Sequence, residues 1–263
     1  MAAERDRGAM IAEVDGWQID VVVQGYPGKS VCHGGLGWST IALLRGHERV
    51  ALIDVGSFSQ RSLIISQLAA RGLTPADVTD VLLTHSHWDH AINWVMFPKA
   101  RIAIGTKELA WSVKEPWGTT PVPELYVREL DRSKQTVLVN AGDEVLPGVT
   151  AHDAPGHTPG HLMFVLNGRD RDVIFTGDSA KNRAEILSLT ADMSYDQAVS
   201  RASMEKMWEL WRSKPNSIVV PGHDVPMLLD GGAPKYIGER AAAISSWFGD
   251  TLDQTKLFEL TVR

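Results

Sequence analysis

The sequence predicts an α/β protein that folds as a single domain. Apolar runs rich in Val, Ile and Leu recur along the chain, and segments with helical periodicity lie between them. Turn residues separate these segments, and no internal repeat, long linker or low-complexity tract interrupts the series. A chain of 263 residues can bury a sizeable core in one such domain, so the expected domain spans residues 1–263.

Charge and composition limit the partners that this chain can have. The formal net charge is −6 and the pI is about 5.8, without the basic stripe that attracts nucleic acid or an anionic membrane. The N-terminal sequence MAAERDRGAM carries charge where a secretory signal needs an apolar run, and no later stretch is long enough to span a bilayer. We expect a cytoplasmic protein with a small-molecule substrate and no nucleic-acid or membrane partner, and a homodimer remains open.

Three strands are expected near the N-terminus. Residues 17–23 (WQIDVVV) form one apolar run rich in β-branched side chains. Residues 40–44 (TIALL) and 50–54 (VALID) are predicted to form a hairpin, because the turn-like sequence RGHER joins them. These strands are expected to begin the first sheet.

Helices are expected to cover the sheets. Ser59 can cap a helix that Gly72 is placed to end in left-handed conformation. A second helix start is predicted at residues 74–77 (TPAD), which supply a capping hydroxyl, a proline at the first helical position and an acid. A later helix is expected to begin near Ser194. The first and the last of these helices each carry an apolar stripe that is predicted to pack on the core. The stripe of the first helix consists of Leu63, Ile64, Leu68 and Ala69, and that of the last helix of Met204, Met207, Trp208 and Trp211.

The segment THSHWDH, residues 84–90, crowds potential metal ligands at the end of the predicted strand DVLLTH. In an extended backbone His85 and His87 project the same way, while Asp89 and His90 fall in the turn that follows. One isolated His-x-His would more often be two surface histidines of a polar loop. Four donors within residues 85–90 instead favour a metal site.

Three downstream segments can supply further ligands. Residues 154–161 (APGHTPGH) fix a tight loop around His157. The apolar strand DVIFTGD ends at Asp178, whose buried charge needs a cation or several donors to offset its desolvation, and SIVVPGHD runs into His223. Because each ligand follows a strand and a turn, a site on one rim of a sheet sandwich is expected. Cys32 is the only cysteine, so the ligands must be imidazoles and carboxylates, which suit zinc, iron or manganese.

The motifs HSHWDH, PGHTPGH, FTGD and VVPGHD, in this order, resemble the metallo-β-lactamase fold metallo-hydrolase superfamily, in its glyoxalase II and lactonase-like branch. LIDVG, residues 52–56, is similar to the early aspartate segment of that family. The resemblance spans about residues 17–225. It implies an αβ/βα four-layer sandwich, with two mixed sheets flanked by helices and a dinuclear metal site between the sheets.

The resemblance also implies a role for each ligand. Asp178 would bridge two divalent metal ions, for which zinc is expected and iron or manganese are alternatives. One ion would be held by His85, His87 and His157, and the other by Asp89, His90 and His223.

The implied function is a metal-dependent hydrolase that attacks a small carbonyl substrate, a lactone, ester, thioester or amide, with a metal-bridging hydroxide. Asp89 is expected to bind metal and to accept the proton of the hydroxide, and Asp54 either orients a histidine ligand or merely ends a strand. N-acyl homoserine lactonases match the ligands best. They have a tyrosine three residues past the bridging aspartate, where this chain has Lys181.

Several residues around the predicted site have two open interpretations. Lys181 either binds a substrate carboxylate or the developing oxyanion, or is a solvated loop lysine. His161 either makes a structural hydrogen bond or contacts substrate. Trp88 and Trp117 belong to a run of tryptophans, with Trp94 and Trp111, that suggests an aromatic lid, although tryptophans at such spacing usually fill a core.

Two segments are expected to border the site. A lid insertion is predicted near residues 115–131, where the proline-rich EPWGTTPVPELY interrupts the regular alternation, and Trp117 is its pocket candidate. Residues 28–38 form a glycine-rich flap by resemblance, and His33 on this flap is a further pocket candidate, whereas Cys32 is treated as incidental.

Two other function classes fit the same residues. A mononuclear iron persulfide dioxygenase resembles this ligand frame and would hold one iron and consume oxygen. A metal-stabilised binding protein without catalytic activity is the non-enzymatic alternative. Metal content and a substrate screen would distinguish these classes from the dinuclear hydrolase.

Overall fold

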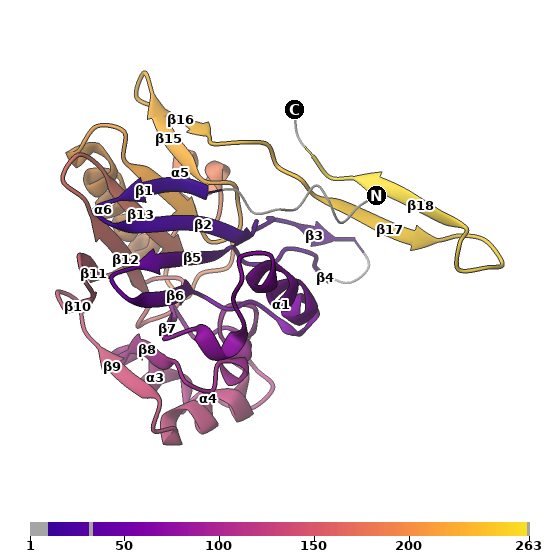
Figure 1. The fold of residues 1–263 in the computed structure, drawn as a ribbon, viewed down its shortest axis with the longest axis horizontal. Helices are drawn as coiled ribbons and strands as arrows, with labels where there is room; N and C mark the ends of the chain where they lie inside the picture. The colour runs from indigo at the N-terminus through magenta and orange to yellow at the C-terminus, as the bar shows by residue number, and fades with distance from the viewer. Residues whose placement is uncertain (1–9, 32–33, 262–263) are drawn as a thin grey trace.

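Two seven-stranded mixed sheets pack face to face in the computed structural model, which describes residues 10–31 and 34–261 (Figure 1). The strand order is β1-β2-β5-β6-β7-β8-β9 in the first sheet and β10-β11-β12-β13-β14-β15-β16 in the second. The first sheet consists of β1 (Met10–Val14), β2 (Trp17–Val23), β5 (Ile41–Gly46), β6 (Arg49–Ile53), β7 (Asp80–Leu82), β8 (Arg101–Gly105) and β9 (Thr136–Val139). The second consists of β10 (Glu144–Leu146), β11 (Val149–Asp153), β12 (Leu162–Asn167), β13 (Asp172–Gly177), β14 (Ile218–Pro221), β15 (Met227–Asp230) and β16 (Ala233–Tyr236).

Helices cover the outer face of each sheet, as the resemblance predicted. The first sheet packs against α1 (Arg61–Ala69), α3 (Thr106–Ser112) and α4 (Glu124–Arg132), and the second against α5 (Arg183–Ser188) and α6 (Gln197–Ser213). The remaining short helical elements are η1 (Phe58–Gln60), η2 (Pro75–Asp77), α2 (Trp88–Ala91) and η3 (Ile92–Met96). The four-layer αβ/βα sandwich is therefore confirmed.

Three apolar layers hold this sandwich together. The layer between the two sheets includes the fully buried Trp17 and Phe164. The outer layers pack Ile64 and Leu68 of α1 on the first sheet, and Trp211 of α6 on the second. Burial of large apolar side chains in all three layers fixes both sheets relative to their helices.

The predicted N-terminal strands and their hairpin are correct to within a few residues. Strands β5 and β6 pair in antiparallel register, and only His47 and Glu48 separate them. Both have positive φ angles, +49° and +59°, as a two-residue hairpin turn of type I′ requires. Ser59, the predicted helix cap, lies inside the 3₁₀ turn η1, whose N-cap is Ser57, and the helix α1 begins only at Arg61.

Two of the other predicted helix starts are wrong in detail. Residues 74–77 start a helical turn as predicted and form a capping box, but the helix does not continue beyond the 3₁₀ turn η2. Val78 returns to extended backbone and buries its side chain before β7. The last long helix, α6, begins at Gln197 rather than near Ser194, since the side chain of Asp196 caps its first turn.

The region predicted as a lid contains a helix. Residues 115–123 form a loop, whereas the second part of the predicted insertion is α4. The hairpin β3 (Lys29–Ser30) with β4 (Gly34–Gly35) lies in the glycine-rich flap. Among the described residues, no helix is long and apolar enough to cross a membrane.

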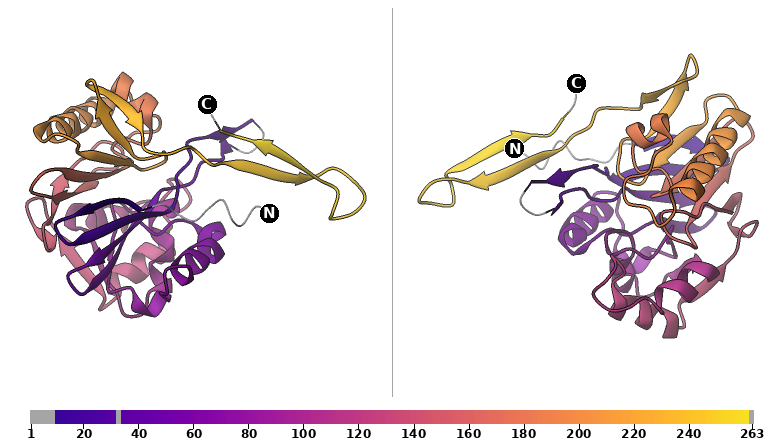
Figure 2. Two further views of the ribbon diagram at one scale, coloured as in Figure 1. Left: turned by 45° about the horizontal axis from the view of Figure 1, so that its top comes forward. Right: turned by 180° about the vertical axis from the view of Figure 1, so that it is seen from behind.

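The C-terminal segment forms an arm that the sequence did not predict. Strands β17 (Ala243–Trp247) and β18 (Thr255–Glu259) pair with each other as an antiparallel hairpin. The hairpin projects from the body of the molecule, shown in yellow in Figures 1 and 2.

Candidate metal centre

The motif at residues 84–90 folds as an extended segment that turns into a short helix. Strand β7 ends at Leu82, and His85 and His87 follow in the non-helical backbone. Asp89 and His90, predicted in the turn that follows the strand, lie there in the one-turn helix α2. Three of these four side chains are buried, and Asp89 is half-buried.

The second sheet supplies three more donors at the same edge of the sandwich. His157 lies in the loop after β11, Asp178 directly follows β13, and His223 follows β14. All three side chains are buried. The structure thus brings together the donor residues predicted from four separate segments of the sequence, His85, His87, Asp89, His90, His157, Asp178 and His223.

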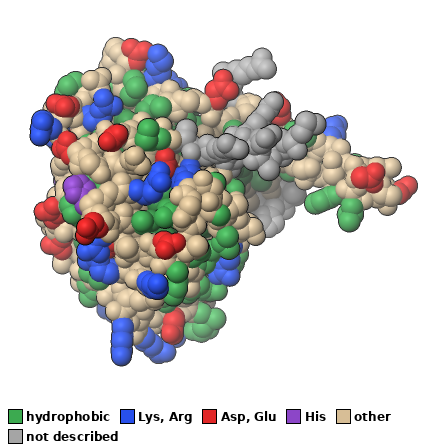
Figure 3. Space-filling model, viewed as in Figure 1, with side chains coloured by type: hydrophobic (Ala, Val, Ile, Leu, Met, Phe, Trp, Pro, Cys, Tyr) green, Lys and Arg blue, Asp and Glu red, His purple; other side chains and the backbone are tan. Residues whose placement is uncertain are grey.

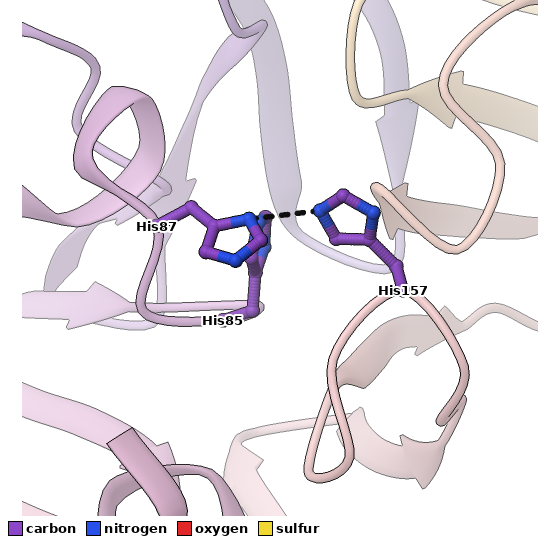
Figure 4. A group of neighbouring side chains, drawn as sticks. All are labelled: His85, His87 and His157. Atoms are coloured by element: carbon purple, nitrogen blue, oxygen red, sulfur yellow. Dashed lines mark hydrogen bonds between the residues drawn. The ribbon is translucent and has the colours of Figure 1, made fainter. Parts of the chain in front are cut away.

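The donors fall into two adjacent groups. In the first, His87 Nδ1 lies 2.9 Å from His157 Nε2, and the His85 ring lies edge-on to both (Figure 4). In the second, His223 Nε2 lies 3.2 Å from His90 Nε2 and 3.3 Å from an oxygen of Asp89. In each group the candidate ligand atoms lie within 4.8 Å of one another, which is compatible with one metal ion per group.

Asp178 lies between the two groups. Its Oδ1 atom is 3.1 Å from both His90 Nε2 and His223 Nε2, while Oδ2 is 3.2 Å from His157 Nε2. One carboxylate oxygen therefore faces each group of histidines. This arrangement suits a carboxylate that bridges two cations.

The electrostatics of the centre fit cation binding. Burial lowers the pKa of His85 and His157 well below the ordinary value and that of His87 to about 4, so these rings offer neutral nitrogen lone pairs. The Nε2 atoms of His85 and His87 are buried without a hydrogen-bond partner among residues 10–31 and 34–261. A metal ion would satisfy such nitrogens.

The second group has the opposite protonation tendency. Burial disfavours the charged form of His90, but the carboxylates around it, chiefly Asp178 and Asp89, outweigh burial and raise its pKa. The pKa of His223 is raised in the same way by Asp178. Burial would raise the pKa of Asp178, but the imidazoles of His223 and His90 lower it well below the usual range. The carboxylates thus attract positive charge to this point, which bound cations would supply.

Outer hydrogen bonds orient several of the rings. Asp54, in left-handed conformation with φ of +55°, lies 2.7 Å from His90 Nδ1 and accepts hydrogen bonds from the backbone N–H and the hydroxyl of Thr84. The Nδ1 atom of His157 lies 2.8 Å from the carbonyl oxygen of Met193. With Nδ1 occupied in this way, Nε2 of His90 and of His157 faces the centre. Asp54 is thus more than a strand-end residue.

Glu108 of α3 is a buried residue beside the centre that the sequence did not reveal. Its Oε1 atom accepts hydrogen bonds from the backbone N–H of Ser86, at 2.9 Å, and from its hydroxyl, at 2.7 Å. Its Oε2 atom accepts them from the Thr158 hydroxyl, at 2.7 Å, and from the Gly160 N–H, at 3.2 Å. Burial raises the pKa of Glu108, although these donors oppose the shift. The carboxylate ties the loop of His85 and His87 to the loop of His157.

Lys181 and His161 both lie close to the centre. The Lys181 side chain is only 12% exposed, and its ammonium lies 3.1 Å from Glu185 Oε1, so it is not a solvated loop lysine. His161 is fully buried, and its Nε2 atom accepts a hydrogen bond from the Asp178 N–H at 3.0 Å. Burial lowers the pKa of His161 to about 3. Its contact with the backbone of Asp178 matches the structural alternative.

The aromatic candidates differ in position. Trp94 is a core residue, and Trp111 lies edge-on to His87 with ring centroids 6.4 Å apart. Trp88 and Trp117 are exposed, and the backbone N–H of Trp88 donates to the carbonyl of Pro121 in the loop that carries Trp117. Two flap residues of the sequence analysis, His33 and Cys32, lie outside the described residues.

Comparisons with known proteins agree with this geometry. The family model described as the metallo-beta-lactamase superfamily matches residues 34–223. An N-acyl homoserine lactonase from Bacillus thuringiensis is 24% identical over 169 residues, 64% of this chain and 64% of its own length. Metallo-beta-lactamase domain-containing protein 1 from Rattus norvegicus is 26% identical over 195 residues, 72% of this chain and 67% of its own. The match therefore spans less than two thirds of the length of the Bacillus lactonase.

Solved structures show the same fold. AidC, a dizinc quorum-quenching lactonase in complex with a product, superposes with a TM-score of 0.70 at 14% identity and covers 89% of this chain and 99% of its own. An N-acyl homoserine lactone hydrolase with N-hexanoyl-L-homoserine at its catalytic metal centre gives a TM-score of 0.64 at 18% identity, over 81% and 95% of the two chains. Because the family model matches residues 34–223, most of the chain, this protein belongs to the metallo-β-lactamase superfamily.

Proposed function

We propose that this chain is a dinuclear metal-dependent hydrolase of small carbonyl compounds, with lactones as the first substrate class to test. The position of Asp178 carries this proposal, because its two oxygens face two separate groups of histidines. The names of the similar proteins support lactones, since they act on or bind homoserine lactones and their products. Esters, thioesters and amides share the same carbonyl chemistry.

The donor set fits two divalent cations, with zinc proposed and iron or manganese as alternatives. Two bound divalent ions supply an activated water and a Lewis acid for the carbonyl oxygen. In the proposed assignment Asp178 contributes to both ions. One ion is held by His85, His87 and His157, and the other by Asp89, His90 and His223.

Two side chains are proposed to act on the substrate directly. Asp89 is half-buried, and one of its oxygens lies 3.3 Å from His223 Nε2, so its carboxylate can take up the proton released during attack. The Lys181 side chain is only 12% exposed, and the Lys181 backbone carbonyl accepts a hydrogen bond from the N–H of the candidate ligand His223 at 2.8 Å. A buried ammonium there can bind a substrate carboxylate or stabilise the developing oxyanion.

The loop of residues 115–123 is proposed to border the entrance as a lid. Trp88 and Trp117 are exposed there, and the Pro121 carbonyl links the loop to the start of α2. Apolar side chains beside polar ligands are typical of pockets that bind small molecules. An acyl or other apolar part of the substrate would lie against these rings.

Elemental analysis combined with a screen of lactones, esters and thioesters tests the proposal. The expected result is close to two equivalents of divalent metal per chain, together with lactone hydrolysis that stops on chelation and returns when metal is added. One equivalent of iron with oxygen consumption would instead identify a persulfide dioxygenase-like enzyme. Two bound metals without turnover of any substrate would leave a metal-stabilised binding protein.

A further inference from the structure

The C-terminal arm, defined as residues 242–260, extends from the body as a two-stranded hairpin (Figure 1). Strand β17 pairs only with β18 in the described part of the chain. Six residue steps from Ala242 to Phe248 carry the arm outward by roughly 20 Å at the rise of an extended strand. An isolated two-stranded hairpin is at best marginally stable in water. Among residues 10–31 and 34–261, the two strands of the arm pair only with each other.

The exposed side chains of the arm are unusually apolar. Trp247, Phe248, Leu252 and Leu257 are 61%, 70%, 82% and 62% exposed. The Phe248 ring packs edge-on against Phe258, and Leu252 lies at the tip, where its carbonyl accepts the indole N–H of Trp247. Such a concentration of exposed large apolar side chains marks an interaction surface.

Buried contacts fix the direction of the arm at its base. The guanidinium of Arg240 forms an ion pair with the buried carboxylate of Asp224, which also accepts a hydrogen bond from the Tyr236 hydroxyl at 3.0 Å. The side chain of Gln24 accepts a hydrogen bond from the Ala241 N–H at 2.8 Å. These contacts lie next to the candidate ligand His223. They hold the base of the arm in a defined orientation relative to the body.

The body carries a second exposed apolar surface, the rim patch, formed by Phe58, Trp117, Leu125 and Tyr126. Phe58 and Tyr126 pack edge-to-face with ring centroids 5.6 Å apart, so η1 and α4 join in one surface. Leu125 and Trp117 are 66% and 55% exposed. Figure 3 shows exposed apolar side chains on the arm.

The charges around the two surfaces are complementary. At the rim patch, the guanidinium of Arg61 lies 4.8 Å from the Phe58 ring centre and that of Arg128 lies 4.7 Å from the Trp117 ring centre. The nearby Glu124 carboxylate is engaged by the Gly118 N–H. In the arm, three exposed acids, Asp250, Asp253 and Glu259, outnumber the one exposed lysine, Lys256. An acidic apolar tip thus matches an apolar patch with two arginines.

We propose that two copies of this chain form a dimer by exchanging arms, each tip packing on the rim patch of the other copy. The arm projects away from α4 of its own chain, so the two matching surfaces cannot meet within one molecule (Figures 1 and 2). A twofold axis satisfies both surfaces at once, because each copy then offers one arm and one patch. Burial of both arms also compensates for their weak stability when isolated.

Sedimentation velocity of the full chain across a concentration series tests the dimer. The double substitution Phe248→Ser with Leu252→Ser is expected to raise the dimer dissociation constant by about tenfold or more, because it removes central apolar contacts. Leu138→Ser is the matched control, since Leu138 is 53% exposed on β9 outside both surfaces, and it should leave the constant unchanged.

Charge reversal tests which surfaces meet. Asp250→Lys and Arg128→Glu are each expected to weaken the dimer, and the combined variant is expected to regain most of the lost affinity. A wild-type chain that stays monomeric at all concentrations would overturn the proposal. The apolar side chains of the arm would then have to bind something other than a second copy of this chain. A dimer that the arm substitutions leave unchanged, or a combined variant no better than the single ones, would also overturn it.

Discussion

Glu108 connects two ligand loops through its buried carboxylate. Each carboxylate oxygen accepts two hydrogen bonds, from Ser86 on one side and from Thr158 and Gly160 on the other. A fully buried carboxylate with four donors is better satisfied than any neutral side chain of its shape would be. Its role is to position ligands, because it does not itself reach the centre.

Glu108→Gln is predicted to loosen this connection. The NH₂ group of the new amide would face the backbone N–H of either Ser86 or Gly160, so that two donors meet without an acceptor. This unsatisfied contact is expected to lower the free energy of unfolding by about 1–3 kcal/mol. Metal affinity is expected to fall by about 10–100-fold, as for other outer-sphere partners of metal ligands. Urea unfolding and competition with a chromophoric chelator measure the two effects. Glu129→Gln, on the exposed face of α4, is the control, and an equal loss in both variants would refute the positioning role.

Lys181→Met is predicted to leave metal content unchanged and to lower kcat/KM on the true substrate by one to a few powers of ten, about 1.5–4 kcal/mol. The ligand set stays intact, whereas a charged contact in a nearly dry site is lost. A loss mainly in KM would indicate substrate binding, and equal losses in kcat and kcat/KM would indicate an oxyanion contact. Lys134→Met, on an exposed lysine, is the control. Unchanged kinetics in both variants would remove Lys181 from the site.

His161 is predicted to make the metal-free protein acid-sensitive. Burial lowers its pKa from 6.5 to about 3, so the unfolded chain binds its proton first as the pH falls. Its contribution to stability is complete above pH 6.5 and is lost toward pH 3, with a slope of about 1.4 kcal/mol per pH unit. His161→Gln should reduce the slope of unfolding free energy between pH 5 and 6.5 by roughly this amount. An unchanged slope in the chelated protein would contradict the assignment.

At the scale of single residues, the sequence predicted the donors because each follows a strand and a turn. His223 after β14 and Asp178 after β13 have this local signature. Glu108 has none, because a glutamate in the helical segment TKELAWS is normally expected on the exposed face. Only the packing of α3 against two loops reveals its burial.

At the scale of elements, helix α6 supports the loop that carries His157. Gly156 has a φ angle of +127°, and a Cβ atom there would lie 2.4 Å from the Ser200 backbone nitrogen near the start of α6. The Asp196 N–H donates to the Gly156 carbonyl, and the Asp196 side chain caps the helix. The helix start and the ligand loop therefore form one packed unit.

Gly156→Ala is predicted to displace His157 and to weaken metal binding, because the new methyl group meets helix backbone that cannot move aside cheaply. Gly142→Ala is the matched control, since Gly142 also has a positive φ, +93°, but its Cβ would meet no atom within 4 Å. Both variants carry backbone strain of about 1–3 kcal/mol, and only Gly156→Ala adds the clash. Thermal unfolding and metal titration of the two variants would show no difference if the loop moved freely.

Strands were easier to predict than the C-terminal arm for a physical reason. Strands such as β2 and β13 are buried on both faces and appear as continuous apolar runs. In the arm, the polar pair Ser246 with Lys256 lies on the same face as Ile244 with Phe258. The other face carries Ser245 opposite Leu257, so neither face is wholly apolar. Without a buried face, the sequence of the arm shows no periodicity that predicts its pairing.

At the scale of the whole molecule, the candidate centre joins the two halves of the sandwich. The first half contributes the motif around His85, and the second contributes His157, Asp178 and His223. The sequence predicted this arrangement through its resemblance to the superfamily. Neither the apolar runs nor the charge pattern alone could predict which sheet edges face each other, because that depends on packing of side chains far apart in the chain.

Removal of metal is therefore predicted to destabilise the whole protein rather than one loop. Ions that bind the folded chain alone add about 2.7 kcal/mol to its stability when free metal is a hundredfold above the dissociation constant. Without these ions, the carboxylates of Asp178 and Asp89 remain buried or half-buried beside protonatable histidines. The edges of the two sheets also lose the ions that both would bind.

Thermal unfolding of the metallated protein, before and after chelation and after zinc is returned, measures this effect. The Tm is expected to fall on chelation in a single transition, because both sheets lose the same ions, and to recover with zinc. Asp178→Ala is the matched variant, since it removes the carboxylate that faces both histidine groups, and it should start at a lower Tm and respond little to chelator. A protein with two measured metal equivalents whose Tm does not change on their removal would show that apolar packing alone holds the two sheets together.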